Sequence, residues 1–111
     1  MNIQIFGKSK CFDTKKAERW FKERGIKFQS VDLLRYGLSQ GEFQSVCRAL
    51  GGAEALIDPK SKAAAELRYL ALEEDRLARL MEDPRLLRTP IVRNGKQATV
   101  GYQPEIWAAW T

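Results

Sequence analysis

Cys11 lies where a cysteine thiol can act as a nucleophile. It follows a strand-like run at residues 3–6 and precedes an amphipathic segment at residues 13–24. A thiol at such a strand-to-helix turn is close to the helix N-terminus, where unpaired N–H groups and the helix dipole favour the thiolate. We therefore predict that Cys11 is the reactive residue of this chain.

The charge around this turn is strongly basic. The segment from Met1 to Lys27 holds eight Lys or Arg and three acidic residues, so the net charge of +5 belongs to this quarter of the chain. Cations lower the pKa of a nearby thiol and attract oxyanions or anionic thiols such as glutathione. Lys8 and Lys10 flank the turn and are candidate substrate ligands, whereas most of the other cations are explained by a solvated helix face.

Composition limits the classes of protein and of site. A chain of 111 residues with 44% hydrophobic content predicts one domain, residues 1–111. Two distant cysteines, Cys11 and Cys47, do not make a disulfide framework, and without histidine neither a four-ligand zinc site nor a Cys–His pair is available. Activation of Cys11 must therefore come from cations, backbone groups or a helix end.

The same composition indicates a cellular setting. The sequence has no apolar stretch of membrane-spanning length and no signal-peptide pattern, so we expect a cytoplasmic protein without a membrane partner. It also has no base-reading motif, which makes nucleic acid the weakest partner class.

The first half of the chain predicts a β-α-β unit. Strands are expected at residues 3–6 and 26–31, and Gly25 ends the helix between them, which predicts parallel pairing of the two strands. Ser39 and Glu42 have the spacing of a capping box, which predicts another helix.

The elements that follow complete a mixed sheet. The helix begun by the capping box ends at Gly51, and Cys47 on its apolar face is interpreted as a small buried hydrophobe. Residues 60–81 predict two short helices with a break near residue 72. Asn94-Gly95 predicts a hairpin with a type I′ turn between strands at 91–93 and 97–100.

A closing helix is expected from Pro104, presenting Ile106, Trp107 and Trp110. Together the elements predict an α/β fold with a mixed four-stranded sheet and helices on its faces.

Arg88-Thr89-Pro90 is a second candidate feature and leads directly into the hairpin. The planar fork of donors on Arg88 suits an oxyanion, although a solvated surface arginine is the ordinary alternative. A proline at the first residue of a strand is tolerated, so the motif is also compatible with a purely structural role at the start of the strand.

Three segments in this order resemble the arsenate reductase family, including its regulator branch, Spx. They are the Cys11 turn with the helix at 15–21, the segment Asp-Pro-Arg-Leu-Leu-Arg-Thr-Pro-Ile-Val at 83–92, and Val-Gly-Tyr at 100–102. The resemblance implies a thioredoxin-like, glutaredoxin-like fold with a helical insertion. It also implies that Cys11 is the nucleophile, that Arg88 is an oxyanion ligand, and that the Thr89–Pro90 peptide bond beside them is cis.

The chemistry implied by this family is attack of a thiolate on arsenic. An anion that attacks an anion needs nearby positive charge, which Arg88, Lys8 and Lys10 are expected to supply. Thr14 helps to shape the turn and stands where the regulator branch has the second cysteine of a Cys-x-x-Cys switch. A local disulfide switch is therefore excluded, and glutathione with glutaredoxin is the expected external source of electrons, with no bound cofactor.

The chain also departs from the reductase pattern. Reductases of this family carry arginines in the insertion and in the last hairpin, where this sequence has Lys60, Lys62 and Lys96. Lysine lacks the bidentate fork, so oxyanion binding should be weaker than with three arginines. The sequence therefore does not establish arsenate as the substrate.

An alternative function comes from residues 52–57. This stretch is similar to the one through which the regulator branch docks on the RNA polymerase α-subunit, although a glycine after a helix also has a capping role. A non-enzymatic regulator that binds the α-subunit is therefore the second hypothesis.

Overall fold

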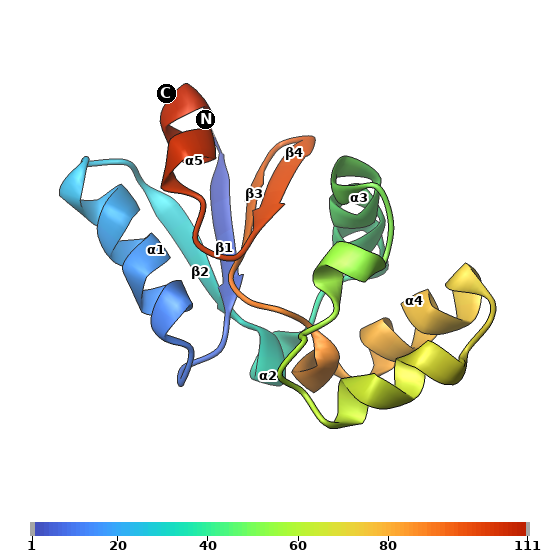
Figure 1. Cartoon of the computed structure of the whole chain (residues 1–111). Helices are drawn as coiled ribbons and strands as arrows, with labels where there is room; N and C mark the ends of the chain where they lie inside the picture. The colour runs from blue at the N-terminus through green and yellow to red at the C-terminus, as the bar shows by residue number, and fades with distance from the viewer. Residues whose placement is uncertain (1, 111) are drawn as a thin grey trace.

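A mixed four-stranded sheet lies at the centre of the computed structural model, which describes residues 2–110 (Figure 1). Its strand order is β2-β1-β3-β4. Strand β1 (Ile3–Gly7) pairs in parallel with β2 (Phe28–Asp32) and antiparallel with β3 (Ile91–Asn94), which in turn pairs antiparallel with β4 (Gln97–Val100).

Helices α1 (Phe12–Glu23) and α5 (Pro104–Trp110) cover one face of the sheet (Figure 1). Residues alternate between the two faces of a strand, so β1 presents Ile3 and Ile5 to this side and Phe6 to the other. Aromatic rings fill the α1–α5 side, where Trp107 is fully buried and its indole N–H donates to the Thr99 hydroxyl at 2.8 Å.

A helical insertion between β2 and β3 covers the opposite face and builds the larger core (Figure 1). It consists of α2 (Leu33–Tyr36), α3 (Gln40–Leu50), the 3₁₀ helices η1 (Glu54–Leu56) and η2 (Ala63–Tyr69), α4 (Glu73–Glu82) and the 3₁₀ helix η3 (Pro84–Leu86). The expected capping box is present, because Glu42 N–H donates to the Ser39 hydroxyl and Ser39 N–H donates to the Glu42 carboxylate. The break near residue 72 is confirmed, although the first of the two helices is 3₁₀ rather than α.

Two local predictions for the sheet are corrected. Strand β2 begins at Phe28 rather than at Ile26, because the Ile26 N–H still donates to the Phe21 carbonyl at the end of α1. The prediction of a type I′ turn at Asn94-Gly95 is wrong. Asn94 pairs with Gln97 in the β3–β4 ladder, so the two-residue loop consists of residues 95 and 96. Gly95 has φ +60°, but Lys96 does not have a positive φ, because no described non-glycine residue has one. A positive φ at the first loop residue alone is the pattern of a type II′ turn.

On α5, Ile106 is exposed rather than part of the packed face, on which Trp107 is buried and Trp110 is half-buried. No helix among the described residues is long and apolar enough to cross a membrane.

Candidate functional site

Cys11 is the N-cap residue of α1, just beyond the end of β1. Its N–H donates to the Lys8 carbonyl at 3.0 Å, which closes the turn, and its own carbonyl accepts from the Lys15 N–H at 3.3 Å. The side chain makes no cap hydrogen bond in the thiol form. The half-buried sulfur therefore lies at the start of a 12-residue helix, where the first N–H groups have no helical acceptor.

The pKa of the Cys11 thiol is lowered from its ordinary value. Burial alone raises this pKa, but hydrogen bonds from the side chains of Thr14 and Thr89 and from the backbone N–H groups of Thr14 and Asp13 stabilise the thiolate and outweigh burial. None of these groups is a cation. Within the described chain, dipoles and hydroxyls rather than lysines are thus the groups that activate the sulfur.

Thr14 is held in place by a close approach to the backbone of β1. It is buried, and its hydroxyl has no hydrogen-bond partner among the described residues. A Cβ added at Gly7 would lie 2.6 Å from the Thr14 hydroxyl oxygen, so only glycine leaves room for this side chain. The hydroxyl is therefore available to donate to the thiolate.

Thr89 approaches Cys11 from the other end of the chain. The Cys11 sulfur lies 3.6 Å from the Thr89 carbonyl oxygen, and the Thr89–Pro90 peptide bond is cis, as the family resemblance implied. Backbone hydrogen bonds fix both neighbours, because the Arg88 N–H donates to Leu56 and the Pro90 carbonyl accepts from Gly101, each at 2.8 Å.

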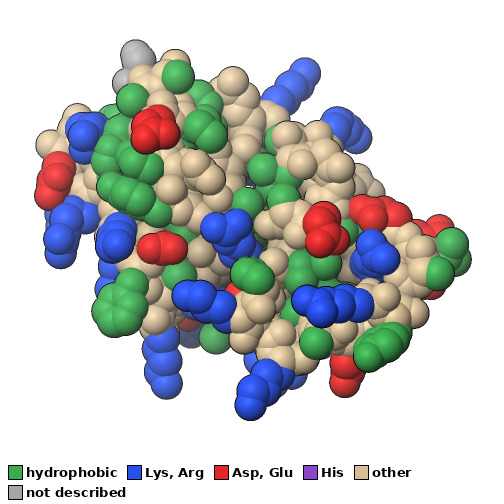
Figure 2. Space-filling model, viewed as in Figure 1, with side chains coloured by type: hydrophobic (Ala, Val, Ile, Leu, Met, Phe, Trp, Pro, Cys, Tyr) green, Lys and Arg blue, Asp and Glu red, His purple; other side chains and the backbone are tan. Residues whose placement is uncertain are grey.

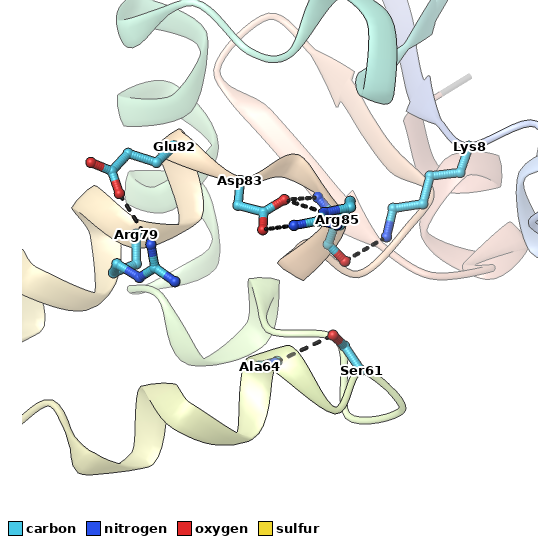
Figure 3. A network of polar contacts seen from close by, with 7 residues as sticks. All are labelled: Lys8, Ser61, Ala64, Arg79, Glu82, Asp83 and Arg85. Atoms are coloured by element: carbon cyan, nitrogen blue, oxygen red, sulfur yellow. Dashed lines mark hydrogen bonds and ion pairs between the residues drawn. The ribbon is translucent and has the colours of Figure 1, made fainter.

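The Lys8 ammonium is bound to backbone carbonyls. It donates to the carbonyls of Leu87 at 2.7 Å and Arg85 at 3.1 Å, and Figure 3 shows the Arg85 contact beside the Asp83–Arg85 ion pair. Lys8 therefore ties the Cys11 turn to the segment that leads into Thr89, a positioning role that its sequence position does not reveal.

Two neighbouring cavities hold Cys11 and Arg88 separately, while Thr14 lines a third, smaller cavity of about 320 Å³. The cavity that contains Cys11, here called the thiol cavity, has a volume of about 540 Å³. Its lining residues are Lys8, Ser9, Lys10, Cys11, Phe12, Asp13, Leu34, Asp58, Lys60 and Thr89.

Arg88 lines the second cavity, here called the arginine cavity, of about 550 Å³, and Asp58 lines both. Lys8, Lys10 and Thr89 thus line the same cavity as Cys11, whereas Arg88 lines the adjacent one. Lys60, one of the lysines that stand where the reductases have arginine, does line the thiol cavity. Sequence reasoning did not place Asp58 or the exposed Phe12 in the site, and only the folded insertion carries Asp58 to the Cys11 turn.

The 52–57 stretch begins where Gly52, with φ +131°, lies against Glu73 of α4. The Ala53 N–H donates to the Glu73 carboxylate at 2.8 Å. Burial, with a smaller contribution from the Glu73 charge, raises the pKa of the half-buried Cys47 to about 11. Cys47 thus packs beside the core as a thiol of low reactivity, although it is half-buried rather than buried as its helical position predicted.

Known proteins resemble this chain over nearly its full length. Residues 6–110 match the ArsC family. The chain is 37% identical over 110 residues to the global transcriptional regulator Spx 2 of Oceanobacillus iheyensis, a match that covers 95% of this chain and 80% of that protein.

The fold is similar to arsenate reductase from Vibrio cholerae, with a TM-score of 0.84, 26% identity, and 98% and 97% of the two chains covered. It is also similar to an ArsC family related protein from Bacteroides fragilis, with a TM-score of 0.86, 20% identity, and 100% and 98% covered. The predicted thioredoxin-like architecture with a helical insertion is confirmed, and the chain belongs to the ArsC family.

Proposed function

We propose that the protein is a cytoplasmic thiol-dependent oxidoreductase in which Cys11 is the nucleophile and glutathione, alone or with glutaredoxin, is the external reductant. The place of Cys11 as N-cap of a 12-residue helix, which favours the thiolate, is the observation that carries this proposal, and the lowered pKa of the thiol agrees with it. At neutral pH a larger share of this sulfur is thiolate, the form that attacks a disulfide. Cys47, with a raised pKa, does not compete for the reaction.

The proposed reaction has two exchange steps that balance. The Cys11 thiolate attacks the glutathione sulfur of a mixed disulfide RS–SG, so that the Cys11–SG bond forms, the RS–SG bond breaks and RS⁻ leaves. A second glutathione thiolate then attacks the Cys11–SG bond, releases the Cys11 thiolate and forms oxidised glutathione. An external thiol is needed because Thr14 stands where a vicinal resolving cysteine would be.

The charge around Cys11 favours a disulfide over arsenate as the substrate. Attack on an oxyanion by a thiolate needs a cation at the reacting atoms, but the Lys8 ammonium is bound to two carbonyls and Arg88 lines the other cavity. Lys10 and Lys60 remain in the thiol cavity, both exposed. A disulfide bond carries no charge at the attacked sulfur, so dipoles and hydroxyls are enough to activate the thiolate.

Single-turnover reactions test this function. Wild-type protein and Cys11→Ser are each mixed with a glutathione mixed disulfide or with arsenate, and release of the thiol product or of arsenite is followed. We expect rapid thiol release by wild type alone and slow or no arsenite formation. Equal rates for the two proteins would refute the proposal, and fast Cys11-dependent arsenite formation would refute the choice of substrate. Cys47→Ser is the matched control and should react like wild type.

A regulator is the second candidate function, favoured by the 37% identity to Spx 2. Its proposed contact is the 52–57 stretch with the RNA polymerase α-subunit, and exposed Glu54 within that stretch is accessible to a partner. Binding of the purified α-subunit to wild type and to Glu54→Lys tests it. Binding that the substitution weakens would support a regulator, whereas no binding by a protein with a reactive Cys11 would exclude it. Substitution of Gly52 is a poorer probe, because its positive φ would strain any side chain.

A further inference from the structure

The arginine cavity has a charge pattern of its own. Arg68 from η2, Arg76 from α4 and Arg88 line it, together with the carboxylates of Glu54 and Asp58. Its volume of about 550 Å³ is within the range of small-molecule sites. Three arginines and two carboxylates leave the lining with an excess of one positive charge, which favours an anionic ligand.

The guanidinium groups are available to a ligand. Among the described residues, the side chains of Arg68 and Arg88 make no hydrogen bond or ion pair, and Arg76 uses only its Nε, which donates to the Leu70 carbonyl at 2.9 Å. The Arg88 side chain lies over Gly101, where a Cβ would be 2.9 Å from Nη2. Free planar forks of this kind bind carboxylates in a bidentate manner.

The carboxylates of the cavity restrict the ligand further. Among the described residues the Glu54 carboxylate makes no hydrogen bond or ion pair, so it is free to accept from a ligand ammonium. Figure 2 shows basic side chains across the middle of this face of the molecule and acidic side chains among them over the insertion. Three cations with two carboxylates suit a zwitterion of net negative charge better than a compact polyanion.

The position of the cavity links it to the reacting sulfur. Asp58 lines both the arginine cavity and the thiol cavity. Arg88 immediately precedes Thr89, whose carbonyl oxygen lies 3.6 Å from the Cys11 sulfur. The shared Asp58 makes the two cavities adjacent, so we expect an extended ligand bound in the arginine cavity to reach the thiol cavity.

We propose that the arginine cavity binds the charged ends of glutathione, the two carboxylates by the arginines and the ammonium by Glu54, while the glutathione sulfur extends toward Cys11. This inference rests on the proposed function and names the site of its reductant. It also reassigns Arg88, which then binds a carboxylate remote from the reacting atoms instead of an oxyanion at the sulfur.

Binding of S-methylglutathione, which cannot exchange with Cys11, tests the cavity separately from the chemistry. Calorimetry compares wild type, Arg68→Gln, Arg88→Gln and the matched control Arg48→Gln, an exposed arginine of α3 that lines neither cavity. Loss of one charge-assisted pair at a solvent-accessible site should weaken binding about three- to tenfold, and the control should bind like wild type. No binding by wild type, or equal binding by all four proteins, would overturn the inference.

Regeneration of the Cys11 mixed disulfide separates the two proposals. If the cavity is the glutathione site, glutathione should regenerate Cys11 faster than 2-mercaptoethanol does, and Arg88→Gln should remove that preference without slowing 2-mercaptoethanol. Equal rates with both thiols in wild type would refute the proposal that the arginine cavity binds glutathione, but they would not contradict the proposed oxidoreductase function. A Cys11 that forms no mixed disulfide would refute the proposed function. Binding of S-methylglutathione would then still decide whether the arginine cavity is a glutathione site.

Discussion

Thr14→Val is the substitution that most directly tests how Cys11 is activated. Valine keeps the shape that packs against Gly7 and removes only the hydroxyl that donates to the thiolate. A hydrogen bond to a charged group contributes about 1.5–3 kcal/mol. Because Cys11 is only half-buried, water replaces part of this contribution, and we expect a net loss near 1.4 kcal/mol, which is about tenfold in the thiolate–thiol equilibrium.

The reaction rate should change less than the equilibrium. A more basic thiolate is intrinsically more nucleophilic, with a Brønsted coefficient of about 0.4–0.5, so a tenfold loss of thiolate is offset by about a threefold gain in reactivity. Thr14→Val should therefore react about threefold more slowly with a disulfide near neutral pH and about threefold faster once both proteins are fully ionised. The two pH–rate profiles should cross.

Stopped-flow exchange with a chromogenic disulfide across this pH range measures both limits, and Thr14→Ser is the matched control because it keeps the hydroxyl. Profiles of Thr14→Val and wild type that coincide would refute the assignment of Thr14 as the donor. A Thr14→Ser profile that follows the valine variant would show that packing, not the hydroxyl, sets the pKa of Cys11.

Gly7→Ala should displace the Thr14 hydroxyl by crowding its side chain from β1. The added Cβ would press on Thr14, so we expect slower exchange by Cys11 near neutral pH together with a loss of about 1–3 kcal/mol in the free energy of unfolding. Gly41→Ala is the control, because a Cβ there meets nothing within 4 Å and the φ of that glycine is not positive. An alanine at position 7 with wild-type kinetics and stability would contradict the described contact.

The remaining predictions concern the second thiol and the aromatic core. Cys47, with its pKa raised to about 11 by burial and by Glu73, should alkylate far more slowly than Cys11 at pH 8, and mass spectrometry should find one modified thiol; comparable labelling of both would disprove the described burial. Since the unfolded chain ionises this thiol first, its contribution to stability should be lost as pH rises from about 9 through 11, a loss that Cys47→Ser should not show. Thr99→Val leaves the buried indole N–H of Trp107 without its acceptor and should lower the free energy of unfolding by about 1–3 kcal/mol in denaturant titrations, whereas Thr99→Ser should be close to wild type.

Short sequence patterns correctly predicted the helix ends that depend on interactions between neighbouring residues. The capping box at Ser39 and the helix start at Cys11 depend on residues within one turn, and both were correct. The hairpin turn was wrong because its type depends on register, and pairing of Asn94 with Gln97 moves the loop by one residue. Side-chain direction was the other failure, since only the folded insertion decides that Lys8 meets carbonyl oxygens and that Arg88 lines the next cavity.

The way Cys11 is activated restricts the substrate that it serves. A thiolate stabilised by fixed hydroxyls and helix N–H groups keeps its lowered pKa without a cation, but it offers an incoming anion little compensation for repulsion at the point of attack. A substrate neutral at the reacting sulfur and charged at a distance avoids this cost, because its charges can be bound in the arginine cavity while the disulfide meets the thiolate. Remote binding of this kind is the usual means by which an enzyme holds a reacting bond in place. On the proposed function, the placement of Arg88 in the arginine cavity rather than in the lining of the thiol cavity is therefore what adapts the site to glutathione disulfides rather than to arsenate.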